Sequence, residues 1–199
     1  FAIPLAHKFG AGDYKGLRAF MVNAVYLSAV FAVVMTIVTV VFCRPILELM
    51  RTPDNIIDGA YLYIVIIFAG IPATYLYNLI SAIIRSMGDS KTPVVFLVIS
   101  SVMNIVLDLV FIINLHLGVA GASLATVISQ AVSGIGCLIY SWKKFEILHP
   151  DADERSWNSS YMKTLCGMGV PMGLQYSITA IGSVILQSAV NTLGSIIVW

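Results

Sequence analysis

Five long apolar runs are the feature that most restricts what this chain can fold into. A helix needs about 20 largely apolar residues to cross the ~30 Å hydrocarbon layer of a bilayer, since each residue rises about 1.5 Å. After an apolar stub, the runs that meet this length lie at about residues 17–43, 57–84, 93–115, 119–142 and 161 to the end. Only 11% of the 199 residues are charged, against about 25% in soluble domains. The sequence therefore predicts an all-α, multi-pass transmembrane helix bundle.

The basic residues divide unevenly between the two ends of these predicted helices. Arg44 and Arg51 lie at one end. Nine lie at the other: Lys8, Lys15, Arg18, Arg85, Lys91, Lys143, Lys144, Arg155 and Lys163. By the positive-inside rule, the end that carries nine cations is cytoplasmic. The first and the last full helix are then both expected to run outward.

Domain organisation follows from the charged stretch at residues 143–160, which separates the fourth and fifth apolar runs. We predict that this stretch is a cytoplasmic linker between a helix group at 1–142 and the start of a second group at 161–199. The chain begins at Phe1 rather than at a methionine and ends within an apolar run. We therefore expect it to be a piece of a longer protein.

Several functions are disfavoured by composition. The formal net charge is +1, which predicts no basic surface for nucleic acid. The three cysteines are widely spaced in or beside apolar runs, unlike a disulfide framework or a metal site: Cys43, Cys137 and Cys166. The three histidines fall in loops or at helix ends, so no set of catalytic residues is visible: His7, His116 and His149. An enzyme is not predicted, and neither is a bound cofactor.

Glycine and proline mark the turns and the weak points of the helices. In RSMGDSKTP, we expect Gly88 to end one helix in the left-handed conformation, and Thr92 and Pro93 to be the N-cap and first residue of the next. Two spans are interrupted, at AGIP (69–72) and GMGVPMG (167–173). Proline removes a helical hydrogen bond and kinks the helix, so Pro72 and Pro171 are hinge candidates. Close helix packing is the alternative explanation.

Asp108 is the one acidic residue predicted to lie inside a span. At a helix centre an aspartate costs about 2.5 to 3.5 kcal/mol of insertion free energy, which the surrounding aliphatic residues offset. Ser101, Asn104 and Asp108 are spaced i, i+3 and i+7 and so share one face of their helix. If the next turn lies near Leu117, Thr126 is level with Asp108 on the following helix. Gln130 is level with Asn104 in the same way, so polar residues converge there.

Two interpretations of this polar cluster compete. In the first, the carboxyl group only hydrogen-bonds its neighbours and locks two helices together, although an asparagine could do the same without the cost of ionisation. In the second, it binds a proton or a cation, because a buried carboxyl group can alternate between a neutral and a charged state. We favour the second interpretation.

The sequence resembles the multidrug and toxic compound extrusion (MATE) transporters of the MOP superfamily. The stretch IIRSMGDSKTPVVFLVISSVMNIVLDLVF, followed by LGVAGASLATVISQ, is similar to their fourth to sixth helices, and KFGAGDYKGLRA to the loop after their second. This resemblance covers nearly the whole chain. It implies helices two to seven of a twelve-helix fold with two lobes: most of the N-lobe, the linker and the first C-lobe helix.

The resemblance also implies roles for the polar residues. Asp108 and Asn104 match the fifth-helix motif to which the DinF-like branch of the family is thought to couple export. Thr126 matches a polar position of the sixth helix in the same site, and Asn78 a fourth-helix asparagine. The seventh helix lacks the acidic residue of the NorM-like branch, since VPMGLQYSITAIG offers Gln175 and its neighbours instead. This departure favours the DinF-like branch.

The expected function is a secondary antiporter of the cell membrane that exports organic cations, drugs or other amphipathic toxins in exchange for H⁺ or Na⁺. Asp108 would bind the coupling ion, and no metal other than Na⁺ is expected there. Asn104 and Thr126 would hold its oxygens, and Met103 and Phe111 could contact an apolar substrate, though ordinary packing also explains them. The alternative is a lipid-linked oligosaccharide flippase of the same superfamily, which usually carries basic residues within its helices. A passive channel suits a single buried carboxylate less well.

Overall fold

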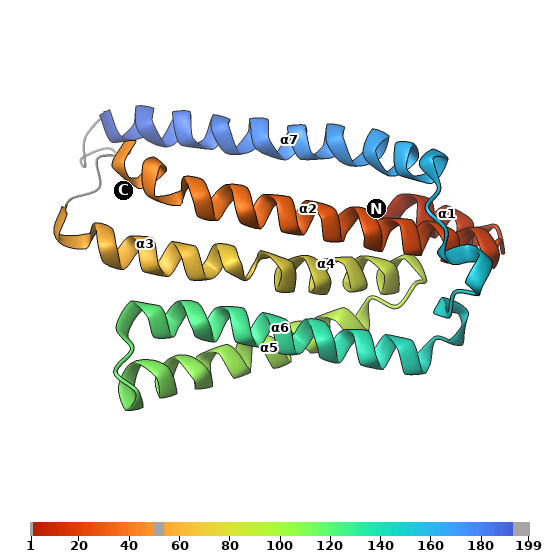
Figure 1. The fold of residues 1–199 in the computed structure, drawn as a ribbon, viewed down its shortest axis with the longest axis horizontal. Helices are drawn as coiled ribbons and strands as arrows, with labels where there is room; N and C mark the ends of the chain where they lie inside the picture. Colours follow the sequence, from red (N-terminus) through yellow and green to blue (C-terminus); the bar gives the residue numbers. More distant parts are fainter. Residues whose placement is uncertain (1, 50–53, 193–199) are drawn as a thin grey trace. The chain divides into compact units, whose positions relative to one another are not determined.

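The computed structural model describes residues 2–49 and 54–192, which form helices joined by short connections (Figure 1). The described chain divides into two compact units, Ala2–Trp157 and a second that begins at Asn158. This division falls inside the stretch 143–160 that the sequence suggests as a linker. The assignment of the two units to the lobes of a larger transporter stays a prediction.

The expected all-helical architecture is confirmed. The first unit contains α1 (Ala2–Gly10), α2 (Tyr14–Leu49), α3 (Asp54–Ala69), α4 (Ile71–Ser86), α5 (Lys91–Leu109) and α6 (Gly118–Lys144). A π-helical turn, Val110–Asn114, continues α5, and two 3₁₀ turns follow α6 at Glu146–Leu148 and Ala152–Arg155. The second unit is α7 (Ser159–Thr192).

Four helical stretches of the described chain are long and apolar enough to cross a membrane: Tyr14–Glu48, Ile56–Ser86, Lys91–Asn114 and Gly118–Lys144. They match the first four predicted spans. The fifth predicted span forms one continuous helix, α7, with Pro171 inside it. Its described part is less apolar than the other four, because residues 167–177 bring in glycines, a proline, a glutamine and a serine.

α6 is the central helix of the first unit and packs against α3, α4 and α5. Its buried residues are small: Gly121, Ser123, Ala125, Ser129, Ser133, Gly134, Cys137 and Ser141. Small side chains let neighbouring backbones approach closely. A Cβ atom at Gly134 would lie 3.3 Å from the backbone nitrogen of Tyr77 in α4. The close packing of α4 on α6 therefore depends on this glycine.

The interruption predicted at residues 69–72 is present as a break between α3 and α4. The helix stops at Ala69, Gly70 forms the turn, and Pro72 lies within the first two residues of α4. Proline is tolerated there because the amide group that it lacks would have no helical acceptor. Whether this break acts as a hinge stays a prediction.

The connection between α4 and α5 confirms one expectation and corrects another. Gly88 has a φ of +89°, as expected for the left-handed residue after a helix. However, α5 begins at Lys91, so Thr92 is not its N-cap. The N-cap is Ser90, which makes no side-chain capping bond. Asp89 supplies the acceptor instead, since its Oδ1 accepts a hydrogen bond from the Thr92 amide at 3.0 Å and its Oδ2 one from the Thr92 hydroxyl at 2.7 Å. The carboxylate satisfies a backbone donor that the helix leaves free.

The segment after α6 is fastened to the start of α2 by ion pairs. Glu154, whose side chain is 1% exposed, accepts two hydrogen bonds from the Arg18 guanidinium, at 2.6 and 2.7 Å. Lys15 pairs with Asp153 at 2.7 Å. Tyr26 of α2 donates to the Arg155 carbonyl at 3.1 Å. The stretch predicted as a linker is thus ordered against α2 as far as these residues.

These ion pairs stabilise the ionised form of the carboxyl groups. The hydrogen bond from Arg18 lowers the pKa of Glu154 despite its burial, and the Asp151 amide contributes in the same direction. The hydrogen bond from Lys15 lowers the pKa of Asp153. The hydrogen bonds from Thr92, followed by that from Lys144, hold the pKa of Asp89 well below its usual range.

Candidate functional site

A polar cavity of about 320 Å³ lies between α4, α5 and α6. Its lining contains no charged side chain among the described residues, and ten of its eleven residues carry a hydroxyl or an amide group: Thr74, Tyr77, Asn78, Ser100, Ser101, Asn104, Thr126, Ser129, Gln130 and Ser133, with Leu97 as the apolar member. Such a wall can hydrogen-bond a polar ligand or water from several sides.

Hydrogen bonds between the three helices hold this wall in place. The Thr74 hydroxyl of α4 donates to the side-chain oxygen of Gln130 in α6. From α5, the Asn104 amide donates to the Thr126 hydroxyl of α6 over a long 3.4 Å. The Ser133 hydroxyl donates in turn to the Phe96 carbonyl of α5 at 3.2 Å. The polar groups of the cavity are thereby oriented by bonds across helices.

Five of the six residues predicted for the site line this one cavity: Asn78, Ser101, Asn104, Thr126 and Gln130. Asn104 and Gln130 were expected at the same depth, and both lie in its wall. The hinge candidate Pro72 lies in the first turn of α4, whereas Pro171 belongs to the other unit. Neither Met103 nor Phe111 is in the lining.

Asp108 stands apart from the cavity lining, one helical turn after Asn104 on α5. Its Oδ1 is buried and has no hydrogen-bond partner among the described residues. Asn104 and Thr126, which were expected to hold the carboxylate oxygens, are instead bonded to each other. A buried carboxylate oxygen without a donor is costly. Protonation of the group or binding of a cation would relieve that cost.

The helix changes its geometry two residues after Asp108. From Val110 to Asn114 the turn is π-helical, and the Leu115 amide bonds the Val110 carbonyl at 3.0 Å, five residues back. Turns of this kind occur often at functional sites within helices. The carboxyl group therefore lies where the regular hydrogen-bond ladder of α5 ends.

Five polar lining residues were not predicted from the sequence: Thr74, Tyr77, Ser100, Ser129 and Ser133. A signal for some of them exists. Thr126, Gln130 and Ser133 are spaced i, i+4 and i+7 on α6, and Thr74 and Asn78 are spaced i and i+4 on α4, as residues on one helix face are. Tyr77 fits the same pattern, since it lies three residues after Thr74 on α4.

Comparison with known proteins identifies the family. The MatE family model matches residues 2–110, more than half of the chain. The chain belongs to the MatE family. It is similar to the "Probable multidrug resistance protein YpnP" of Bacillus subtilis, with 31% identity over 98% of the MatE chain and 43% of that protein. It is also similar to the "Multidrug export protein MepA" of Staphylococcus haemolyticus, with 24% identity over 96% of the chain and 42% of that protein.

Solved structures agree with this assignment. An outward-facing multidrug resistance MATE transporter of the MOP superfamily matches 97% of the MatE chain and 43% of its own, with a TM-score of 0.88 and 26% identity. A MOP superfamily transporter from Pyrococcus furiosus matches 94% of the chain and 42% of its own, with a TM-score of 0.85 and 26% identity. The MatE chain spans less than half the length of these relatives. It is a multi-pass protein of the cell membrane.

Proposed function

We propose that this chain belongs to a secondary antiporter that exports organic cations or other amphipathic compounds in exchange for H⁺ or Na⁺, by the DinF-like mode of coupling. The names of the relatives support export of toxic compounds. The observation on which the coupling rests is the buried, unpaired Oδ1 of Asp108, one helical turn from the polar cavity. Ionisable residues within a membrane commonly mark ion pathways.

The coupling follows from the charge of one carboxyl group. When Asp108 is ionised, a cationic substrate or Na⁺ can neutralise it where an unpaired charge is costly. When Asp108 is protonated, that attraction is lost. Proton entry and substrate binding are then mutually exclusive, and the difference in affinity between the two states would drive the transport cycle.

The cavity also bears on the flippase alternative. Anionic lipid-linked sugars would call for cationic side chains in the binding site. The wall of this cavity carries hydroxyl and amide groups and no lysine or arginine among the described residues. Export of a cationic or neutral compound is the better fit.

The test is the substitution Asp108→Asn in the intact transporter. Asparagine keeps the shape and the hydrogen bonding but cannot ionise, so we expect expression and melting temperature close to wild type and loss of ion-driven export. Asp108→Glu should retain partial export with a shifted pH dependence. The measurement is efflux of a fluorescent organic cation from vesicles under an imposed proton or sodium gradient. Asp58→Asn, an exposed carboxyl group at the start of α3, is the matched control. Wild-type export by Asp108→Asn would leave Asp108 as a helix clamp only.

A further inference from the structure

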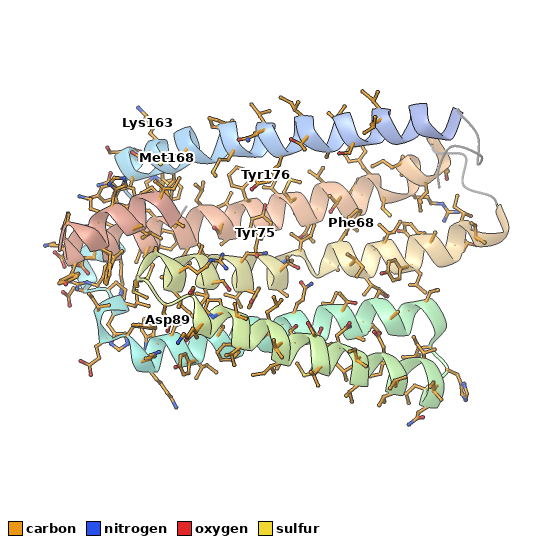
Figure 2. The ribbon with its side chains drawn as sticks, turned by 180° about the vertical axis from the view of Figure 1, so that it is seen from behind. Phe68, Tyr75, Asp89, Lys163, Met168 and Tyr176 are labelled. Carbon is orange, nitrogen blue, oxygen red and sulfur yellow. The ribbon has the colours of Figure 1, made fainter. Side chains whose placement is uncertain are left out.

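Three cations gather around the α4–α5 connection without a carboxylate partner among the described residues. Arg85 lies in the last turn of α4, Lys91 begins α5 and Lys143 is in the last turn of α6, and all three are exposed. The Lys144 ammonium pairs with Asp89 Oδ2 at 3.0 Å, which ties the end of α6 to this connection. Figure 2 shows Asp89 at this meeting point. We call Arg85, Lys91 and Lys143 the corner patch.

Elsewhere at this end of the unit, most cations are neutralised. The exception is the exposed Arg155, whose guanidinium donates to the Pro150 carbonyl at 3.4 Å. Lys8 pairs with Asp13 at 2.7 Å, and Lys15 and Arg18 pair with carboxylates of the segment after α6. Around the corner patch, by contrast, four cations face two carboxylates, those of Asp89 and the exposed Glu146, which leaves a net charge of +2. Apart from Arg155, the cations of this end that have no carboxylate partner among the described residues are therefore those of the corner patch.

The ends of the candidate membrane spans are where lipid headgroups are expected, and the corner patch lies at these ends. Each of its residues lies within the last turn of a membrane-crossing stretch or at its first residue. Tyr140 and Trp142, 40% and 46% exposed, precede Lys143 on α6, and such aromatic residues are typical of the membrane interface. Guanidinium and ammonium groups donate several hydrogen bonds to phosphate oxygens.

We propose that the corner patch binds the phosphate headgroup of an anionic phospholipid in the cytoplasmic leaflet. Basic sites between the ends of transmembrane helices on that side are suited to such headgroups. The site is separate from the polar cavity, and its lipid would bridge the ends of α4, α5 and α6. It does not depend on the proposed antiport.

Native mass spectrometry of the purified intact protein, titrated with phosphatidylglycerol or phosphatidylcholine, tests this proposal. The variant R85Q/K91Q/K143Q should bind phosphatidylglycerol at least about tenfold more weakly, since each cation near a membrane surface contributes about fivefold before screening. Its phosphatidylcholine binding and its melting temperature in phosphatidylcholine should match wild type. K163Q removes one exposed cation of α7 (Figure 2) and should leave phosphatidylglycerol binding unchanged.

Two further measurements distinguish binding of a lipid headgroup from binding of a soluble phosphate. Added sodium chloride should weaken phosphatidylglycerol binding to the wild-type protein, a result that does not depend on any variant folding. Unchanged phosphatidylglycerol binding by the triple variant would overturn the proposal. An equal loss in K163Q would show a general charge effect and would also overturn it. Competition by millimolar inorganic phosphate that removes the bound lipid would assign the patch to a soluble anion instead.

Discussion

Asp108 and Glu154 differ in the hydrogen bonds that their buried carboxylate oxygens receive. Glu154 receives two hydrogen bonds from Arg18 and one from the Asp151 amide. Asp108 has a buried oxygen with no donor among the described residues. The first group is fixed in its ionised form and can only stabilise the fold. The second keeps an oxygen without a donor, and it is the group that we propose binds the coupling ion.

Glu154→Gln should destabilise the first unit by about 2 kcal/mol, because it leaves a largely buried guanidinium with only a distant carboxylate. Arg18 would keep only Asp151, at 3.5 Å. Denaturant unfolding in detergent measures the change. The exposed pair of Lys15 and Asp153 supplies the control, since Asp153→Asn should alter stability much less. Equal effects of the two substitutions would contradict a special role for Glu154.

The same pair predicts a dependence of stability on pH. Because the pKa of Glu154 is lowered in the folded protein, its contribution is fully present above its unfolded pKa of about 4.3. That contribution is lost as the pH falls through the folded pKa. The difference in unfolding free energy between wild type and Glu154→Gln should therefore be constant near neutral pH and shrink below about pH 4.3. A constant difference down to the lowest accessible pH would contradict this assignment.

At the level of single residues, the sequence predicts side chains that share a helix better than side chains that meet across the fold. Depth in two adjacent helices places Asn104, Thr126 and Gln130 in one region, and all three line the cavity. It pairs Asn104 with Gln130, however, whereas Asn104 bonds Thr126 in the structure. Arg18 and Glu154 are 136 residues apart, and neither lies in a motif that indicates the other. Such a contact depends on how the segment after α6 folds back, which no local pattern encodes.

Among the elements, the break between α3 and α4 depends on close contact with α6. A Cβ atom at Gly70 would clash with the side chain of Val127 and lie 3.1 Å from the Ile67 carbonyl oxygen. The backbone itself poses no obstacle, since Gly70 has a φ of −79°. The glycine is needed for space rather than for conformation.

Gly70→Ala should therefore destabilise the first unit by about 1 to 3 kcal/mol through overpacking. In the double variant Gly70→Ala/Val127→Ala, the clash is removed, so the combined loss should be at least about 0.5 kcal/mol smaller than the sum of the single losses. Unfolding of the four proteins of this cycle in detergent gives the coupling. Strict additivity would show that the two sites do not touch.

Helix positions follow well from the sequence, but two details of the helices do not. Runs of apolar residues identify the spans, and glycine with proline identifies the break at Gly70. The π-helical turn at Val110–Asn114 has no marker, because its valine, phenylalanine and isoleucines suit a regular helix equally well. α5 starts at Lys91 rather than at the expected Pro93, because Asp89 supplies a stronger acceptor than the Thr92 hydroxyl.

Across the whole first unit, the charged groups separate the two ends. The α1–α2 and α4–α5 connections and the segment after α6 lie at one end, and the α5–α6 turn at the other (Figure 1). Eight of the nine cations predicted to be cytoplasmic lie in or next to the connections at the first of these two ends. The arrangement agrees with a single cytoplasmic end, though the orientation in the membrane stays a prediction.

Cysteine labelling in intact cells tests this orientation. After replacement of Cys43, Cys137 and Cys166, an impermeant maleimide should label Leu117→Cys from outside. It should label Ser90→Cys only once the membrane is opened. The reason is the positive-inside rule applied to the cation-rich end. Labelling with the opposite sidedness would invert the whole assignment.

The ion pairs that fasten the first unit are also unevenly placed. Lys8–Asp13, Lys15–Asp153, Arg18–Glu154 and Lys144–Asp89 all lie at the cation-rich end. At the opposite end, the pairs among the described residues are the exposed contacts of Arg44 with Glu48 and Asp58, at 3.4 and 3.8 Å. Local opening of backbone hydrogen bonds starts where the fewest contacts resist it. We therefore expect the unit to open first at the end that holds Arg44, so that amide hydrogens there exchange before those at the cation-rich end.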